Sequence, residues 1–309
     1  MRQLALALLA GGLLVTAGVL FERYRLEDIA YRSVSTSKLL EQARNGSTDA
    51  TLYLELAKRS RAQYRYPDAL EYLKKCKELR PDLADAYFEE GCVLRALGRN
   101  DDAIGPLKHA AELSPNRPEI PLELAQAYNR TGRLTQAIEA MRRYVDLEPQ
   151  DDYGYFWLGA YTLSAGMFDV AERSLQKARA LNPRRSVTYI ALGNLKLRQN
   201  PGPKELHQAL EIYQRAVELD PNDAEPVQLL ATVYYRQQRY AEAAREFERA
   251  LVIDPSVAEV YYPLGLTYAK MGEKAKSERC LKIADVYQIG KEAFRRPGGA
   301  IADSKPGAR

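Results

Sequence analysis

The side chains that most often carry chemistry are few and scattered in this 309-residue chain. The two histidines, His109 and His207, lie far apart, and neither has the cysteine or carboxylate spacing of a metal site. The three cysteines, Cys76, Cys92 and Cys280, are an odd number without CxxC spacing, which argues against a disulfide framework and a zinc site. These residues therefore predict no metal ion and no cofactor.

Neighbouring carboxylates can act as a general acid and a general base, and such pairs occur at Asp101-Asp102 and Asp151-Asp152. Both pairs stand where helices are expected to begin, and carboxylates there cap free amide groups and complement the helix dipole. The sequence also contains no glycine-rich phosphate loop, no HExxH and no GxSxG. We therefore predict a protein that is not an enzyme.

The overall composition is that of a folded chain with balanced charge. Hydrophobic residues make up 46% and charged residues 28% of the sequence, and 45 basic against 41 acidic residues give a net charge of +4. This hydrophobic content is typical of a globular protein and excludes a wholly disordered one. The small net charge gives no reason to expect a nucleic-acid partner.

The chain is built from an internal repeat that is marked by prolines. When the repeats are aligned with these prolines at position 32, position 20 is alanine in six repeats and position 8 is alanine or glycine in seven. Small residues in two fixed columns predict two helices that approach closely where position 8 faces position 20. The prolines, at intervals of 34, 34, 34, 38 and 34 residues, are Pro81, Pro115, Pro149, Pro183, Pro221 and Pro255.

The remaining positions also fit a pair of antiparallel helices. Positions 4, 7, 8 and 11 form an apolar stripe at helical spacing. Position 15 is glycine at Gly98, Gly132, Gly166 and Gly272, which predicts a left-handed turn between the helices. The proline at position 32 ends the second helix. Four extra residues in the fifth repeat, around residues 200–203, predict a longer turn there.

These columns closely resemble the tetratricopeptide repeat (TPR), a 34-residue unit of two antiparallel helices. The resemblance implies an all-α, right-handed superhelical solenoid of about seven helix pairs over residues 50–291. A linker with a partial leading helix is expected in residues 22–49, and a disordered tail in residues 292–309. The expected repeats are 50–83, 84–117, 118–151, 152–185, 186–223, 224–257 and 258–291.

Proteins of this family bind partners on a concave surface lined by positions 2, 5, 9, 12 and 13 of each first helix. Carried over to this chain, these positions imply a peptide-binding groove with basic residues at position 12 or 13 and an apolar, aromatic middle. The alternative is that the arginines are solvated helix ends and that Phe156 and Ile190 pack inside the superhelix. The candidate groove residues are Lys58, Arg61, Phe88, Arg95, Gln126, Asn129, Arg130, Tyr153, Phe156, Leu163, Ile190, Asn194, Arg198, Gln228, Tyr235, Arg236, Tyr262 and Lys270.

The N-terminus has the character of a membrane segment. Residues 4–21 carry no charge, and a helix of this length reaches roughly 27 Å, close to the thickness of a bilayer core. Arg2 precedes the segment and the charges after it cancel, so we expect the repeats on the non-cytoplasmic side, in the periplasm or exterior. Two interpretations stay open: an uncleaved signal anchor in residues 1–21, or a signal peptide cleaved near Ala17, with secretion of the rest.

Together these features predict a non-catalytic adaptor, tethered to a membrane through residues 4–21, that binds segments of partner proteins in the concave groove. We expect it to act in the assembly of an envelope or secretory complex, without a small-molecule substrate or a nucleic acid. The alternative is that the row of basic residues binds an anionic polysaccharide or another anionic polymer, in which case binding would depend strongly on salt.

Overall fold

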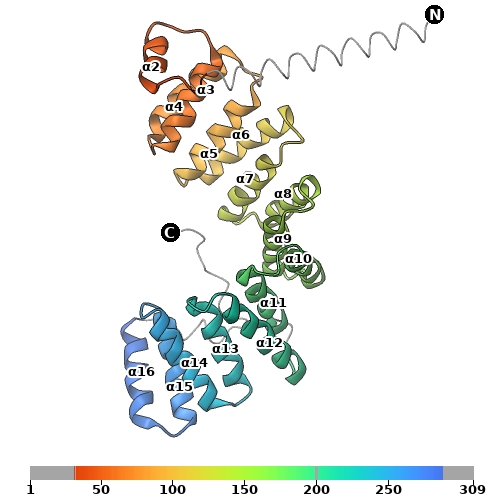
Figure 1. Cartoon of the computed structure of the whole chain (residues 1–309), viewed down its shortest axis with the longest axis vertical. Helices are drawn as coiled ribbons and strands as arrows, with labels where there is room; N and C mark the ends of the chain where they lie inside the picture. Colours follow the sequence, from red (N-terminus) through yellow and green to blue (C-terminus); the bar gives the residue numbers. More distant parts are fainter. Residues whose placement is uncertain (1–30, 32, 199–200, 288–309) are drawn as a thin grey trace, which may run out of the picture. The chain divides into compact units, whose positions relative to one another are not determined.

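The computed structural model describes residue 31, residues 33–198 and residues 201–287. Every regular element in these ranges is a helix (Figure 1). The apolar segment of residues 4–21 and the expected tail of residues 292–309 lie outside the described residues. Among the helices that the structure describes, none combines the length and the apolar character needed to span a bilayer.

The chain divides into two compact units, which we call the N-terminal unit (Met1–Leu147) and the C-terminal unit (Glu148–Arg309). Each of the seven repeats expected from the sequence contains one pair of helices. The N-terminal unit contains α2 (Thr36–Arg44), α3 (Ala50–Ala62), α4 (Tyr66–Leu79), α5 (Ala84–Ala96), α6 (Asn100–Leu113), α7 (Glu119–Arg130) and α8 (Leu134–Leu147). The C-terminal unit contains α9 (Asp152–Ser164), α10 (Phe168–Leu181), α11 (Ser186–Arg198), α12 (Pro203–Leu219), α13 (Ala224–Arg236), α14 (Tyr240–Ile253), the short 3-10 helix η1 (Ala258–Val260), α15 (Tyr261–Lys270) and α16 (Lys274–Val286).

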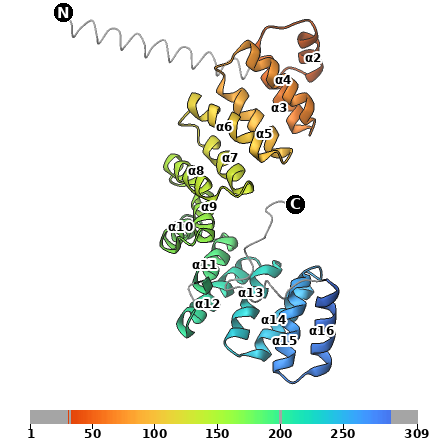
Figure 2. The ribbon, with the colours of Figure 1, turned by 180° about the vertical axis from the view of Figure 1, so that it is seen from behind.

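The helices pack as successive hairpins. The two helices of each repeat contact each other extensively, and within each unit the second helix of a repeat also packs on the first helix of the next. Both views show this order, for example where α15 lies between α14 and α16 (Figure 2). Because neighbouring repeats within each unit share their core, the expected all-helical solenoid is confirmed.

The glycines at position 8 make room for the residue at position 24. A Cβ atom on Gly91 would lie 2.4 Å from Leu107 Cγ, and one on Gly193 would lie 2.4 Å from the Tyr213 ring. The sequence led us to expect the alanine of position 20 as the nearest neighbour, and the structure corrects this. The position-20 alanines, such as Ala243, are fully buried, but the larger side chain one turn further along the second helix covers the glycine.

The turn between the helices of a repeat takes the left-handed conformation that position 15 predicts. Gly98, Gly132, Gly166 and Gly272 have φ angles of 76°, 73°, 73° and 82°. Two other repeats place a residue with a side chain at the same position, Tyr64 with φ 60° and Gln238 with φ 61°. An L residue pays roughly 1–2 kcal/mol for this conformation. The turn geometry is therefore imposed by the helix pair and not by glycine alone.

The extra residues of the fifth repeat lengthen a helix more than a turn. Helix α12 has 17 residues, whereas the second helix of the fourth repeat, α10, has 14. Pro203 occupies the first turn of α12, and Glu205 Oε2 accepts a hydrogen bond of 3.0 Å from the Gly202 N–H. The fixed φ angle of proline suits the first turn of a helix, and the glutamate side chain accepts a hydrogen bond from a backbone N–H group that has no partner within the helix. Most of the four extra residues therefore lie in helix α12, whereas the sequence led us to expect them in the turn.

The acidic pairs have structural roles at helix starts. Asp151 caps α9, because its carboxylate accepts hydrogen bonds from the backbone N–H groups of Tyr153 and Gly154, both at 3.2 Å. Asp101 and Asp102 lie in the first turn of α6 and not at its cap. There their charge complements the positive end of the helix dipole.

Candidate functional site

The candidate groove residues lie on the first helices of the repeats, so the N-terminal and the C-terminal unit each carry their own set. In the N-terminal unit they are Lys58 and Arg61 on α3, Phe88 and Arg95 on α5, and Gln126, Asn129 and Arg130 on α7. In the C-terminal unit they are Tyr153, Phe156 and Leu163 on α9, Ile190, Asn194 and Arg198 on α11, Gln228, Tyr235 and Arg236 on α13, and Tyr262 and Lys270 on α15.

In the N-terminal unit the arginines at position 12 are paired with the next repeat. Arg61 Nε donates to Glu89 Oε2 at 2.8 Å, and Arg95 Nε donates to Glu123 Oε2 at 2.5 Å. Both carboxylates come from position 6 of the following repeat. Burial alone would lower the pKa of Arg61, but attraction by Glu89 outweighs it and the pKa is raised. These arginines therefore join neighbouring repeats.

Phe88 was expected to line the groove, and the structure places it in the interior with 8% of its surface exposed. The guanidinium carbon of Arg117 lies 4.1 Å from the centre of the Phe88 ring, and Arg117 also forms an ion pair with Asp85. Arg117 belongs to the end of the same repeat and covers the ring as a cation–π partner. Phe88 is thus a packing residue.

The other candidates of the N-terminal unit are more accessible. Lys58, Gln126 and Asn129 are half-buried, and Arg130 is exposed. Lys58 and Arg130 both take part in polar or electrostatic interactions within the chain. Among these four, Arg130 is therefore the most accessible side chain, and the amides of Gln126 and Asn129 are partly accessible.

In the C-terminal unit the expected apolar anchors are mostly core residues. Leu163 is 3% exposed and Ile190 is 4% exposed, so neither side chain can meet a ligand. Phe156 is half-buried and packs on the cluster formed by Leu175 and Leu192. The expectation of an apolar groove floor is therefore wrong at Leu163 and Ile190, because neighbouring helices close over these positions.

An aromatic group that the sequence analysis did not single out surrounds Trp157 on α9. The centre of its ring lies 5.3 Å from that of Phe156, 5.5 Å from Tyr161 and 5.9 Å from Tyr153. Trp157 occupies position 6, where the first three repeats carry glutamate. Its indole nitrogen is buried and finds no acceptor within the described ranges. The change in the position-6 column was the signal that could have identified it.

A second group of polar residues lies around Asn194 in the C-terminal unit. Asn194 was expected to be open to a ligand, but the residue is fully buried. The hydroxyl of Tyr213, on α12, donates to Asn194 Oδ1 at 2.8 Å. The Asn194 amide nitrogen and the Nε atom of Arg198 are buried and have no hydrogen-bond partner in the part of the chain that the structure describes.

Arg236 and Glu225 lie at opposite ends of α13, and burial affects both. Burial lowers the pKa of Arg236, and only the nearby Tyr213 opposes this shift. Burial raises the pKa of Glu225 to about 7, with Asp223 and Glu259 adding repulsion. Neither charged group has a partner of opposite sign among the described residues. Glu225 stands at position 2, a groove position that the candidate set omitted.

The remaining candidates of the C-terminal unit have accessible side chains. Gln228, Tyr235 and Tyr262 are half-buried, and Lys270 is exposed. The Tyr235 ring packs edge-on against Tyr240, with ring centres 5.5 Å apart. These side chains present polar groups on α13 and α15 without forming a buried site.

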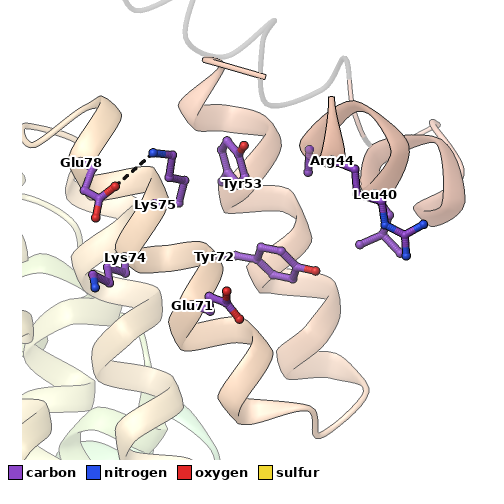
Figure 3. Close-up of a pocket in the computed structure, with 9 residues that line it drawn as sticks. Leu40, Arg44, Tyr53, Glu71, Tyr72, Lys74, Lys75 and Glu78 are labelled. Atoms are coloured by element: carbon purple, nitrogen blue, oxygen red, sulfur yellow. Dashed lines mark hydrogen bonds and ion pairs between the residues drawn. The ribbon is translucent and has the colours of Figure 1, made fainter. Parts of the chain in front are cut away.

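A cleft of about 440 Å³ lies between α2, α3 and α4, and none of the candidate residues lines it (Figure 3). Its wall mixes both charges, and Lys75 Nζ is already 3.2 Å from Glu78 Oε2. No convergent set of groups in it specifies a ligand. The lining residues are Leu40, Ala43, Arg44, Tyr53, Glu71, Tyr72, Lys74, Lys75 and Glu78.

Nucleophilic or metal chemistry finds little support in the described residues. Burial raises the pKa of the Cys76 thiol to about 11 and that of Cys92 to about 12, so both stay protonated at neutral pH. Within residues 31–287, apart from the three undescribed positions, no group of three or more His, Cys, Asp or Glu residues could hold a metal ion.

Family models identify the repeat. Two tetratricopeptide-repeat models match residues 50–118 and 94–155, and the model of the TPR domain of cytochrome c-type biogenesis protein H matches residues 133–258. The chain belongs to the tetratricopeptide-repeat family. The matches follow one another along residues 50–258, so this TPR chain carries the family pattern in both units. No curated protein matches it in sequence.

Solved structures share the fold. MamA is 27% identical, with a TM-score of 0.50 over 55% of this TPR chain and 96% of MamA. A tetratricopeptide repeat protein from Parabacteroides merdae is 16% identical, with a TM-score of 0.62 over 80% of this chain and 96% of that one. YrrB, described as a TPR protein with an unusual peptide-binding site, is 17% identical, with a TM-score of 0.50 over 60% and 93%. At such identities the last two likenesses show the fold alone.

Proposed function

We propose that this TPR chain is a non-catalytic scaffold that binds segments of partner proteins on the first helices of its repeats. The observation that carries the proposal is that helix pairs of one repeat family occupy almost all of the described chain. Repeat arrays of this kind present extended surfaces and leave little room for a separate catalytic domain. The protonated thiols of Cys76 and Cys92 agree with this proposal.

The C-terminal unit is the better candidate for the binding surface. Its first helices carry the half-buried tyrosines Tyr235 and Tyr262 and the aromatic group around Trp157, and such side chains are favoured where proteins meet. An anionic polymer has weaker support, because the ion pairs of Arg61 and Arg95 interrupt the basic row.

Site-specific photocrosslinking in living cells tests this proposal. A photoreactive amino acid is placed at Tyr235 or at Tyr262, and as a matched control at Gln214, an exposed position on the second helix α12. We expect the two first-helix positions to capture one and the same protein and Gln214 not to capture it. The captured protein should then bind the purified full chain directly. Equal capture at all three positions would contradict a groove.

We further propose that the repeats act on the non-cytoplasmic side of a membrane, in the assembly of an envelope or secretory complex. The uncharged residues 4–21 and the preceding Arg2 support this, whether the segment stays as an anchor or is cleaved near Ala17. Residues 133–258 match the TPR domain of a cytochrome c-type biogenesis protein. This match supports the proposed role in the assembly of other proteins.

Protease accessibility separates these locations. Protease added to cells with a permeabilised outer boundary should digest the repeats while a cytoplasmic marker stays intact. Mass measurement of the mature N-terminus distinguishes a chain that begins at Met1 from one that begins after Ala17. Protection of the repeats until the inner membrane is broken would place them in the cytoplasm and contradict the proposed orientation.

A further inference from the structure

Hydrogen bonds from the first repeat hold the segment that precedes α2. The guanidinium group of Arg59, on α3, donates to the Val34 carbonyl at 2.7 Å and to Thr36 Oγ1 at 3.0 Å. It also donates to the Tyr31 carbonyl at 2.8 Å. The Tyr31 hydroxyl in turn donates to Asp49 Oδ2 at 2.6 Å, directly before α3. We call the side chains of Arg59 and Asp49 the latch.

The charge of Arg59 is exceptional for its position in the repeat, position 10. In the six later repeats this position is uncharged and at most 4% exposed. There it packs on the preceding repeat, since Val93 lies in one apolar cluster with Leu73 and Cys76 of the first repeat. Arg59 instead bonds residue 31 and residues 33–36, which we call the strap. The six residues at position 10 are Val93, Ala127, Tyr161, Leu195, Val233 and Thr267.

An acid of the first repeat completes the latch. Glu55 Oε1 accepts a hydrogen bond from Arg59 Nε at 2.7 Å, and the two side chains are 14% and 19% exposed. Glu55 stands at position 6, where Glu89 and Glu123 bind an arginine of the preceding repeat. Hydrogen bonds between charged groups are stronger than those between neutral ones. Arg59 and the strap therefore replace a preceding repeat at this end of the array.

The strap lies close in sequence to the apolar residues 4–21. Only nine residues, 22–30, separate the two. Nine residues reach at most about 30 Å when fully extended, and about 15–18 Å on average as a flexible chain. If the strap and α2 were released, the link to α3 would comprise residues 22–49, or 28 residues. Its average length would then be about 26–32 Å.

We propose that the latch holds the first repeat beside the membrane, so that the array begins within about 30 Å of the bilayer. The link cannot lengthen while the latch is closed. A partner segment that binds the first repeat must therefore lie next to the bilayer as well. This inference rests on the proposed location at a membrane, with residues 4–21 retained as an anchor.

Energy transfer on the full chain in liposomes tests the inference. A fluorescent amino acid replaces Lys74, an exposed residue on α4 in the first repeat, and the lipid head groups carry the acceptor dye. The wild type is compared with Arg59→Gln, with Tyr31→Phe and with the control Arg65→Gln. The control removes the same charge from an exposed position in the first repeat. Hydrogen exchange of residues 33–44 and thermal unfolding are measured on the same chains.

We expect efficient energy transfer and slow exchange of residues 33–44 in the wild type and in Arg65→Gln. In Arg59→Gln, exchange should become about tenfold faster or more, because three hydrogen bonds to the strap are lost. Energy transfer should fall as the link lengthens. Tyr31→Phe removes one hydrogen bond and should cause a smaller change in the same direction. It replaces Arg59→Gln as the test if thermal unfolding shows that Arg59→Gln does not fold.

Three results would overturn the inference while the scaffold function stands. Equal exchange in the wild type and both latch variants would mean that the latch does not hold the strap. Faster exchange with unchanged energy transfer would mean that another contact sets the distance to the bilayer. A mature chain that begins after Ala17 would lack the anchor. Repeats on the cytoplasmic side would instead contradict the proposed location itself.

Discussion

One contact between neighbouring repeats is an ion pair in the N-terminal unit and apolar in the C-terminal unit. In the N-terminal unit, position 12 and position 6 of the next repeat meet as an ion pair, as Arg95 does with Glu123. In the C-terminal unit the same two positions are Leu197 and Leu229, which lie in one buried apolar cluster. The basic residue of that repeat stands one position later, at Arg198. A shift of one residue turns a side chain about 100° around the helix, away from the neighbour's position 6.

This difference separates arginines that pair with an acid of the next repeat from arginines that form no ion pair among the described residues. In a column of basic residues, Arg61, Arg95, Arg198 and Arg236 look equivalent. The structure shows that Arg61 and Arg95 pair with acids of the next repeat. In contrast, the Arg198 Nε atom is buried without an acceptor among the described residues, and burial lowers the pKa of Arg236. A basic residue in a groove column can therefore link two repeats, and an acid at position 6 of the next repeat identifies such a link.

The largest effect should come from the apolar form of the contact. Leu197 is 1% exposed, so Leu197→Ala leaves a cavity between repeats and should lower the free energy of unfolding by roughly 2–5 kcal/mol. Urea unfolding should show the same loss at low and high salt. Val187→Ala, on the same helix but 38% exposed, is the control and should change stability little. An equal loss in both variants would mean that Leu197 is not packed between repeats.

The buried acid of the C-terminal unit should make stability depend on pH. The pKa of Glu225 is raised from 4.5 to about 7, so the folded chain binds more protons than the unfolded chain between these values. Stability should then fall as pH rises from about 4.5 to about 7, by up to about 3 kcal/mol. Glu225→Gln should flatten this dependence and be the more stable chain at pH 8. A parent and a variant with parallel pH profiles would contradict the shift.

Close packing at position 8 should also be measurable. Gly193→Ala places a Cβ atom against the Tyr213 ring and should cost about 1–3 kcal/mol. Gly105→Ala in α6 is the matched control, because a Cβ atom there meets nothing within 4 Å. That control should be stabilised by about 0.5–1 kcal/mol, since alanine favours a helix over glycine. Thermal unfolding of both variants tests this contrast. Equal shifts in melting temperature would show that Gly193 is no more closely packed than Gly105.

The ion-pair form of the contact should contribute less and respond to salt. A double-mutant cycle of Arg95→Ala and Glu123→Ala should give a coupling free energy of about 1 kcal/mol, because both side chains are largely but not fully buried. High salt should reduce this coupling. A cycle of Leu197→Ala and Leu229→Ala should be insensitive to salt. If both cycles respond alike, the two contacts do not differ as proposed.

The smallest effect should come from the left-handed turn residues. Gln238→Gly removes the cost of a left-handed side-chain residue, at φ 61°, but adds entropy to the unfolded chain. We expect a net gain of about 0.5 kcal/mol. Gly98→Ala, at φ 76°, should instead lose about 1 kcal/mol. Destabilisation by Gln238→Gly would show that the glutamine side chain itself supports the turn.

Local rules in the sequence predicted the repeat. Spaced prolines, alanines and position-15 glycines define two helices and a turn, because helix ends and left-handed turns depend on residues close in sequence. The same rules missed the longer α12, where Pro203 and Glu205 start the helix early. That start depends on a capping hydrogen bond between residues 202 and 205, which competes with the turn that the Pro/Gly residues suggested.

The sequence by itself determined the family, the seven helix pairs and the helices that carry the candidate groove. Only the tertiary structure decided which groove residues are available. Leu163, Ile190 and Phe88 are buried in the core. Arg61 and Arg95 form ion pairs with the next repeat. The hydroxyl of Tyr213, on the second helix of its repeat, donates a hydrogen bond to Asn194. The physical reason is that availability depends on which side chains of the same repeat and of the next repeat pack against each groove position, and a single column of positions does not contain that information.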